Sequence, residues 1–321
     1  MALLAFLISA GISYVFVTQS NAGLGSQEVK DLPDHPPNFA KSSPEEVRFR
    51  VLKPNHSQWF DGHRVEIQAT KVNINSDGFR DQEYSTSEPN DTQRIIALGD
   101  SVTFGWGVNQ SDTWPKQLKQ KLNNGSETKV QILNFGVWGY NTTEEVEMLE
   151  EKGLDYSPDK VILQYHRNDA INKTRIKELK KDYAPEIREK YSDQNISEDR
   201  IRNKINKFIY SKEASERSMK PPKKSMADVR KSLGNLNRLS ERNGFSVYIF
   251  GWPVDNRRSE YLSKVSDRYN FTYIETQEVL QGKYDIKTRT SEYKVQDGHP
   301  NARGHSIITE QVFEPVNSTI K

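Results

Sequence analysis

The chain has 321 residues, which is enough for one sizeable α/β domain with extensions. Its 46 basic and 44 acidic residues leave a net charge of +2, which gives no support for nucleic-acid binding through a clustered basic face. The absence of cysteine excludes disulfides, thiolate metal sites and a lipid-modified cysteine. Only 34% of the residues are hydrophobic, which predicts a polar tail, long loops or a solvated insertion.

Residues 1–22 are interpreted as a signal peptide or a membrane anchor. The run 2–17 carries no charge, although it is a little shorter than the roughly 20 residues of an ideal membrane span. Ser20 and Ala22 supply small residues for a cleavage site, but no Lys or Arg precedes the run. We therefore expect a secreted or membrane-anchored protein whose body lies outside the cytoplasm. The same run is a candidate membrane tether.

Two further segments precede the main domain. Residues 23–45 read as a linker because they combine Gly, Ser and acidic residues with several prolines. Residues 46–93 read as a small β-rich preamble packed on the main domain, with short alternating runs at 47–51 and 64–67. This preamble includes a turn signal at 75–80 that carries Phe79 and Arg80.

The main domain, 94–321, alternates strands with helices. The predicted strands are 94–98, 130–135, 160–165, 245–250 and 271–274. Helices are expected around 112–123, from Thr142 or Thr143, in the stretch ending at Asn243-Gly244, and after Pro300 or Asn301. This alternation favours a parallel, doubly wound sheet. A charged insertion at about 171–224 contains an amphipathic helix, and a lid and a solvated spacer are equally open interpretations for it.

The predicted strand ends carry the candidate chemistry. Ser101 follows the first strand in Gly99-Asp100-Ser101, where it is either a nucleophile or a cap of the next helix. His299 precedes the last helix with Asp297 two residues away, so Asp297 can orient the ring of a His299 base. The Ser101 and Gly139 backbone N–H groups and the Asn168 side chain are candidate oxyanion donors. Gly139 as a turn residue, Asn168 as a cap and Asp297-Gly298 as a turn remain the structural alternatives.

These blocks together resemble the SGNH/GDSL hydrolase superfamily, in particular its exported prokaryotic members. Gly99-Asp100-Ser101, Gly139, Asn168-Asp169 and the segment 297–301 correspond to four of its motifs. The resemblance implies a flavodoxin-like, three-layer α/β/α sandwich with a five-stranded parallel sheet, and ester cleavage without a metal or cofactor. His166-Arg167 departs from the small residues that usually precede Asn-Asp in the family. A metal site built from His166, Asp297 and His299 is the less favoured alternative.

The functional hypothesis is a serine esterase. Ser101 attacks an acyl ester with His299 as base and Asp297 as its orienting partner, and water releases the acyl-enzyme. An O-acetyl or other short acyl group on a cell-envelope glycan is the favoured substrate. A polysaccharide O-acyltransferase with the same triad and a catalytically silent glycan-binding surface protein are the alternatives. The sequence leaves the oligomeric state open.

Overall fold

The computed structural model describes residues 40–41, 51–60, 70–87, 91–170, 173–192, 201, 204–205, 208–209, 211–213, 215–216, 226–252, 255–279, 282, 290–293 and 299–320. The expected leader at 1–22 and nearly all of the linker at 23–45 lie outside these residues. None of the helices in the described stretches combines the length and the apolar character of a membrane span.

Five parallel strands form the central sheet in the order β6-β5-β7-β8-β9. They are β5 (Thr92–Gly99), β6 (Lys129–Gly136), β7 (Lys160–Tyr165), β8 (Ser246–Gly251) and β9 (Thr272–Ile274), each within two residues of the predicted strand. The chain proceeds from β5 to β6 on one side and then crosses to β7 on the other. This order places the topological switch point, where open α/β sheets bind ligands, between β5 and β7.

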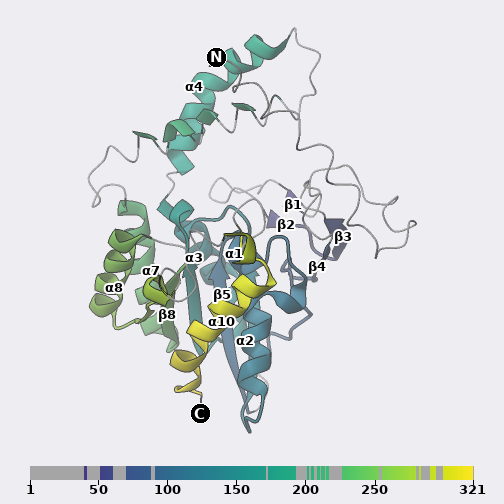
Figure 1. The fold of residues 1–321 in the computed structure, drawn as a ribbon, viewed down its shortest axis with the longest axis vertical. Helices are drawn as coiled ribbons and strands as arrows, with labels where there is room; N and C mark the ends of the chain where they lie inside the picture. The colour runs from purple at the N-terminus through teal and green to yellow at the C-terminus, as the bar shows by residue number, and fades with distance from the viewer. Residues whose placement is uncertain are drawn as a thin grey trace, which may run out of the picture.

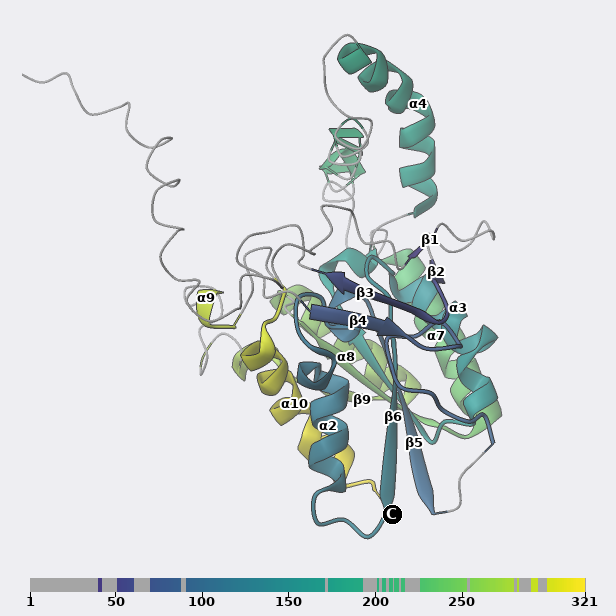
Figure 2. The same cartoon turned by 90° about the vertical axis from the view of Figure 1, so that its right-hand side faces the viewer.

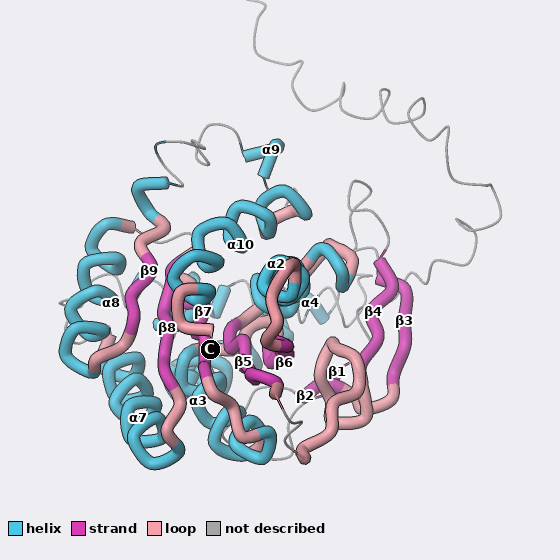
Figure 3. The backbone as a smooth tube through the Cα atoms, turned by 90° about the horizontal axis from the view of Figure 1, so that it is seen from below, coloured by secondary structure: helices cyan, strands magenta, loops and turns pink. Residues whose placement is uncertain are grey.

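Helices cover both faces of the sheet (Figure 3). Ile96 and Leu98 of β5 belong to one hydrophobic core, whereas Ile95 and Ala97 belong to the other, because successive side chains of a strand point to opposite faces. The first core is covered by α3 (Thr142–Glu151), α7 (Ala227–Asn243) and α8 (Asn256–Tyr269), and the second by α2 (Trp114–Asn123) and α10 (Ala302–Asn317). The predicted three-layer α/β/α sandwich with a flavodoxin-like sheet is confirmed.

Local sequence signals set the helix ends. Helix α3 begins at Thr142, and Asn141 caps it in a capping box with Glu144. Helix α7 ends at Asn243, and Gly244 caps it in the left-handed conformation. Short helices in the described residues include α1 (Ser101–Phe104), α9 (Thr290–Tyr293), and the 3-10 turns η1 (Gln110–Asp112), η2 (Gly153–Tyr156) and η3 (Arg167–Ala170).

The preamble contains two antiparallel pairs. Strand β1 (Ala40–Lys41) pairs with β2 (Val51–Leu52), and β3 (His56–Phe60) pairs with β4 (Thr70–Ile74). Of the predicted run 47–51 only Val51 is described, and the run 64–67 lies outside the described residues. Both strands lie within the predicted β-rich preamble, although the sequence analysis did not give their bounds. Strand β4 does alternate, because Thr70, Val72 and Ile74 are buried and the residues between them are exposed.

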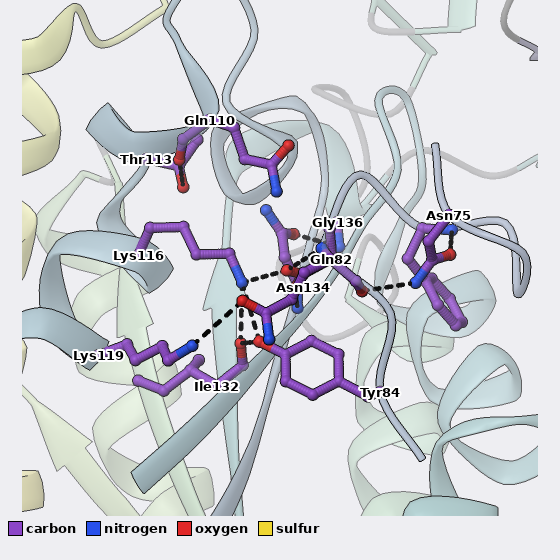
Figure 4. A network of polar contacts seen from close by, with 12 residues as sticks. Asn75, Gln82, Tyr84, Gln110, Thr113, Lys116, Lys119, Ile132, Asn134 and Gly136 are labelled. Carbon is purple, nitrogen blue, oxygen red and sulfur yellow. Dashed lines mark hydrogen bonds and ion pairs between the residues drawn. The ribbon is translucent and has the colours of Figure 1, made fainter. Parts of the chain in front are cut away.

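Residues 79–84, here called the edge segment, join the preamble to the sheet (Figure 4). The Phe79 ring stacks on Phe135 of β6 at a centroid distance of 3.8 Å. The Asp81 carboxylate accepts from the Asn134 backbone N–H (2.8 Å), and the Tyr84 hydroxyl donates to the Ile132 carbonyl (3.0 Å). Because β6 is an outer strand, these bonds satisfy backbone groups that would otherwise form an open sheet edge.

The insertion forms a small core of its own. Helix α4 (Lys173–Ser192) contributes Ile176 and Leu179, which are buried with Ile201, Ile205 and Ile209. These three isoleucines are helical, which agrees with the amphipathic helix predicted within the insertion. Figures 1 and 2 show α4 standing away from the sandwich, beyond the end of the sheet at which α1 lies.

Candidate active site

Ser101 lies immediately beyond the carboxyl end of β5, as the first residue of α1. The helix is capped by Asp100, whose carboxylate accepts from the Val102 N–H (3.0 Å). Ser101 is therefore not the cap, so this alternative for the serine is wrong. A Cβ on Gly136 would lie 2.2 Å from the Phe104 backbone nitrogen, so glycine is what lets α1 pack this closely on β6.

His299 meets Ser101 from the other end of the domain. Its Nε2 lies 2.8 Å from the Ser101 Oγ, although 198 positions separate the two residues. The turn that carries His299 is held by Asn301, which caps α10 by accepting from the Gly304 N–H and donates to the Tyr293 and Glu292 carbonyls. Of the two predicted helix starts, Pro300 and Asn301, the structure places Asn301 as the cap. A serine hydroxyl within hydrogen-bond reach of an imidazole is the geometry of an activated nucleophile.

The other predicted triad member, Asp297, lies outside the described residues. His35 and His63 also lie outside them, and His56 lies in β3. His305 is fully buried and accepts from the Trp114 N–H through Nδ1 (3.1 Å). Desolvation, followed by the charges of Arg80 and His299, lowers the pKa of His305 to about 3, so this ring is neutral at ordinary pH.

Gly139 lies in a tight turn after β6. The Tyr140 N–H donates to the Val137 carbonyl (3.1 Å), and Gly139 has a φ of +76°, a conformation that glycine adopts without steric cost. This turn lies beside the end of β5, because the Val137 N–H donates to the Gly99 carbonyl (3.1 Å). The structure therefore brings Gly139 to the sheet end that carries Ser101.

Asn168 follows β7 within η3, and its side chain is not a helix cap. Its Nδ2 donates to the Asp100 carboxylate (2.9 Å), and its Oδ1 lies 2.6 Å from Nδ1 of His166. Burial by itself would raise the pKa of Asp100, but its hydrogen bonds and the charge of His166 lower it overall, so Asp100 is a carboxylate. The Asn168 amide is therefore hydrogen-bonded to Asp100, the residue that directly precedes Ser101.

Arg80 is a site residue whose role sequence reasoning missed. This fully buried guanidinium, from the edge segment, donates to the carbonyls of Phe104, Gly105 and Val108, which lie at the end of α1 and just beyond it. Desolvation by burial lowers its pKa to about 10. The only signal in the sequence is an arginine within a turn motif, and nothing in that pattern says that its side chain enters the main domain.

With this geometry established, the chain can be compared with known proteins. The model of the GDSL-like lipase/acylhydrolase family matches residues 97–307. The chain belongs to this family. It is therefore an enzyme that hydrolyses ester bonds, as the motifs predicted.

Solved structures similar to this GDSL-like hydrolase include a crystal structure of TesA, with 15% identity over 71% of this chain and 100% of that chain (TM-score 0.48). A lipase/acylhydrolase from Enterococcus faecalis shares 16% identity over 71% of this chain and 97% of that chain (TM-score 0.44). A two-domain esterase active on acetylated mannans shares 14% identity over 72% of this chain and 51% of that chain (TM-score 0.46). A comparison with curated proteins finds no match.

An aromatic wall borders the serine of this hydrolase. Trp106 lies 5.9 Å from the His299 ring and 5.7 Å from Trp138, measured between ring centroids. Trp138 in turn meets the buried Phe104 of α1 edge to face at 5.4 Å. The Trp106 backbone N–H donates to the Ser101 carbonyl (3.0 Å), which holds this tryptophan close to Ser101. Sequence reasoning did not single out either tryptophan.

Of the three residues considered for a metal, His166 and His299 are described and Asp297 is not. No cluster of three or more His, Cys, Asp or Glu side chains in the described part of the chain is arranged to hold a metal ion. His166 contacts Asn168 and Asp100, whereas His299 contacts Ser101.

Proposed function

We propose that this GDSL-like hydrolase is a serine esterase that works through an acyl-enzyme. The observation that supports this mechanism is the 2.8 Å contact between the Ser101 Oγ and the His299 Nε2 at the carboxyl end of the parallel sheet. His299 takes the hydroxyl proton as the Oγ attacks the ester carbonyl, and then passes it to the departing alcohol. Water, activated by the same imidazole, cleaves the acyl–serine bond and restores the hydroxyl.

Three donors are proposed for the oxyanion that forms during attack. The Ser101 N–H lies at the start of α1, the Gly139 N–H lies in the turn after β6, and the Asn168 Nδ2 is attached to Asp100. These donors come from the ends of β5, β6 and β7, which are neighbouring strands. Donors held by a rigid sheet need no reorganisation as negative charge develops on the substrate oxygen. Asp297 is proposed to accept from the second ring nitrogen of His299.

The proposed substrate is an O-acetyl or other short-chain ester of a saccharide, as part of a cell-envelope glycan. The aromatic wall supports this class, because partly buried Trp106 and Trp138 supply flat indole faces beside the reacting serine. Such faces can pack against the C–H side of a pyranose ring while its ester reaches Ser101. The uncharged run 2–17 supports export to the compartment where such glycans lie.

Replacing the nucleophile tests the proposal. Ser101→Ala should lower kcat/KM for p-nitrophenyl acetate at least about 10³-fold, since it removes the attacking oxygen. His299→Ala should cost a similar factor, whereas the exposed Ser111→Ala should behave like the natural protein. A fluorophosphonate probe should label Ser101 in the natural protein. Full activity in Ser101→Ala, or no labelling, would contradict the assignment.

The acceptor of the acyl group is tested by product analysis. A donor ester is supplied together with a glycan acceptor, and both products are measured. We expect free carboxylic acid, because hydrolysis uses water as the acceptor. Acylated glycan as the main product would instead identify an O-acyltransferase with the same Ser101 and His299.

Loss of preference for saccharide esters in Trp106→Ala, with p-nitrophenyl acetate cleavage retained, would support the role of the aromatic wall.

A further inference from the structure

His166 has no part in the Ser101–His299 pair, yet it lies beside a proposed oxyanion donor. It directly follows β7 at the carboxyl end of the sheet, and its side chain is 21% exposed. Its Nδ1 lies 2.6 Å from the Asn168 Oδ1 and 3.5 Å from the Asp100 carboxylate. The backbone on both sides of these contacts is held, because the His166 N–H donates to the Asp169 carboxylate and the Asp169 N–H donates to the His166 carbonyl.

The chemistry of the amide decides the direction of the short contact. An amide oxygen only accepts, so the His166 Nδ1 carries a hydrogen and donates it to the Asn168 Oδ1. At its other end the same amide donates one Nδ2 hydrogen to Asp100. Two directional bonds at opposite ends of a planar group determine both its rotation and which end is oxygen. The second Nδ2 hydrogen of Asn168 is then the one available to a substrate.

Asp100 links this amide to the nucleophile. Its Oδ1 accepts from the Val102 N–H and its Oδ2 accepts from Asn168, and the residue is 1% exposed. Asp100 directly precedes Ser101 and its carboxylate binds the Asn168 amide. The positions of the Ser101 N–H and of the Asn168 amide are therefore both set by this buried residue. A flipped amide would point an oxygen lone pair at the developing oxyanion and repel it.

We propose that His166 is a positioning residue for the oxyanion hole. By donating from Nδ1 to the Asn168 amide oxygen, it keeps the Nδ2 hydrogen directed at the oxyanion. This role rests on the proposed function, and it uses a histidine at a position where the motif otherwise has a small residue. His166 acts through Asn168 and has no proton-transfer step of its own.

The test combines substitutions at the two positions. His166→Leu fills the space without a donor, whereas His166→Asn retains an N–H near the Nδ1 position. With p-nitrophenyl acetate, His166→Leu should lower kcat about ten-fold with little change in KM, and His166→Asn should stay within about three-fold. Asn168→Ala should lower kcat about 10²-fold, in the range of other lost oxyanion donors. In the Asn168→Ala background, His166→Leu should have no further effect.

Controls separate this role from loss of fold and from failure of the esterase assignment. The exposed neighbour Arg167→Ala should match the natural protein, and thermal melting verifies folding. If His166→Leu does not fold, His166→Ser, which is too short to reach the amide, replaces it. Equal kcat for His166→Leu and the natural protein would overturn the proposal, as would an undiminished His166→Leu effect in the Asn168→Ala background. A natural protein that fails to label with fluorophosphonate would instead overturn the proposed function and this role together.

Discussion

Burial and hydrogen bonding give three histidines of this hydrolase three different tasks. His299 is partly buried and touches the Ser101 hydroxyl, which leaves it accessible to a substrate. His166 is partly buried and contacts the Asn168 amide. His305 is completely buried, and its Nδ1 is occupied by the Trp114 N–H, so it can neither reach a substrate nor take a proton readily.

His305 makes stability depend on pH. Its folded pKa of about 3 lies below the ordinary value of 6.5, so between these values the unfolded chain binds a proton that the folded protein does not. The free energy of unfolding should therefore fall as pH drops below about 6.5, by about 1.4 kcal/mol per pH unit from this group. In His305→Asn, whose amide oxygen can accept from Trp114, urea denaturation should show a shallower pH dependence. An identical slope in both proteins would contradict the prediction.

At the scale of elements, two buried arginines donate hydrogen bonds to backbone carbonyls near the two ends of β5. Arg80 donates to the carbonyls at and beyond the end of α1, the helix that begins with Ser101. Arg94, within β5, binds the carbonyls of Ser85, Ser87 and Tyr156 toward the opposite end. Both arginines satisfy several carbonyls with one planar group, which a lysine cannot reproduce. Only Arg80 contacts the loop that carries Trp106.

This difference predicts separable effects. Arg80→Lys should lower the free energy of unfolding by about 2–4 kcal/mol, because buried carbonyls lose their donors, and it should also lower kcat per folded molecule. Arg94→Lys is the matched control, with a similar loss of stability and an unchanged kcat. Urea denaturation measures the free energy of unfolding. Titration with a fluorophosphonate counts the active sites, so that the measured rate can be expressed as kcat per folded molecule. A catalytic defect of equal size in both variants would show that Arg80 has no special relation to the site.

At the scale of the whole molecule, the preamble is part of the catalytic domain's structure. Leu52, Val72, Ile74 and Phe79 are buried in the same core as the helices α3, α7 and α8. The edge segment also covers the outer strand β6. By contrast, the buried apolar residues described in the insertion form a cluster separate from the two cores of the sandwich.

Truncation should reveal this organisation. A fragment of residues 51–321 should be monomeric or a defined oligomer and should cleave p-nitrophenyl acetate. A fragment of residues 91–321 retains Ser101 and His299 but lacks the edge segment, which exposes both apolar surface and the β6 edge, so it should aggregate. Size-exclusion chromatography and circular dichroism compare the two. A well-folded, fully active 91–321 fragment would show that the preamble is dispensable.

The sequence by itself determined the sheet and the family motifs that contain Ser101 and His299. Buried strands such as Val161–Leu163 produce strong local signals, and Gly99-Asp100-Ser101 and His299 are recognisable because their chemistry is tied to short motifs. Tertiary structure decided which distant groups meet. The Arg80 bonds, the aromatic wall and the His166–Asn168–Asp100 chain join residues from different elements, and a one-dimensional pattern records no such distances. Only folding placed Asp100 as the helix cap and so left Ser101 available to His299.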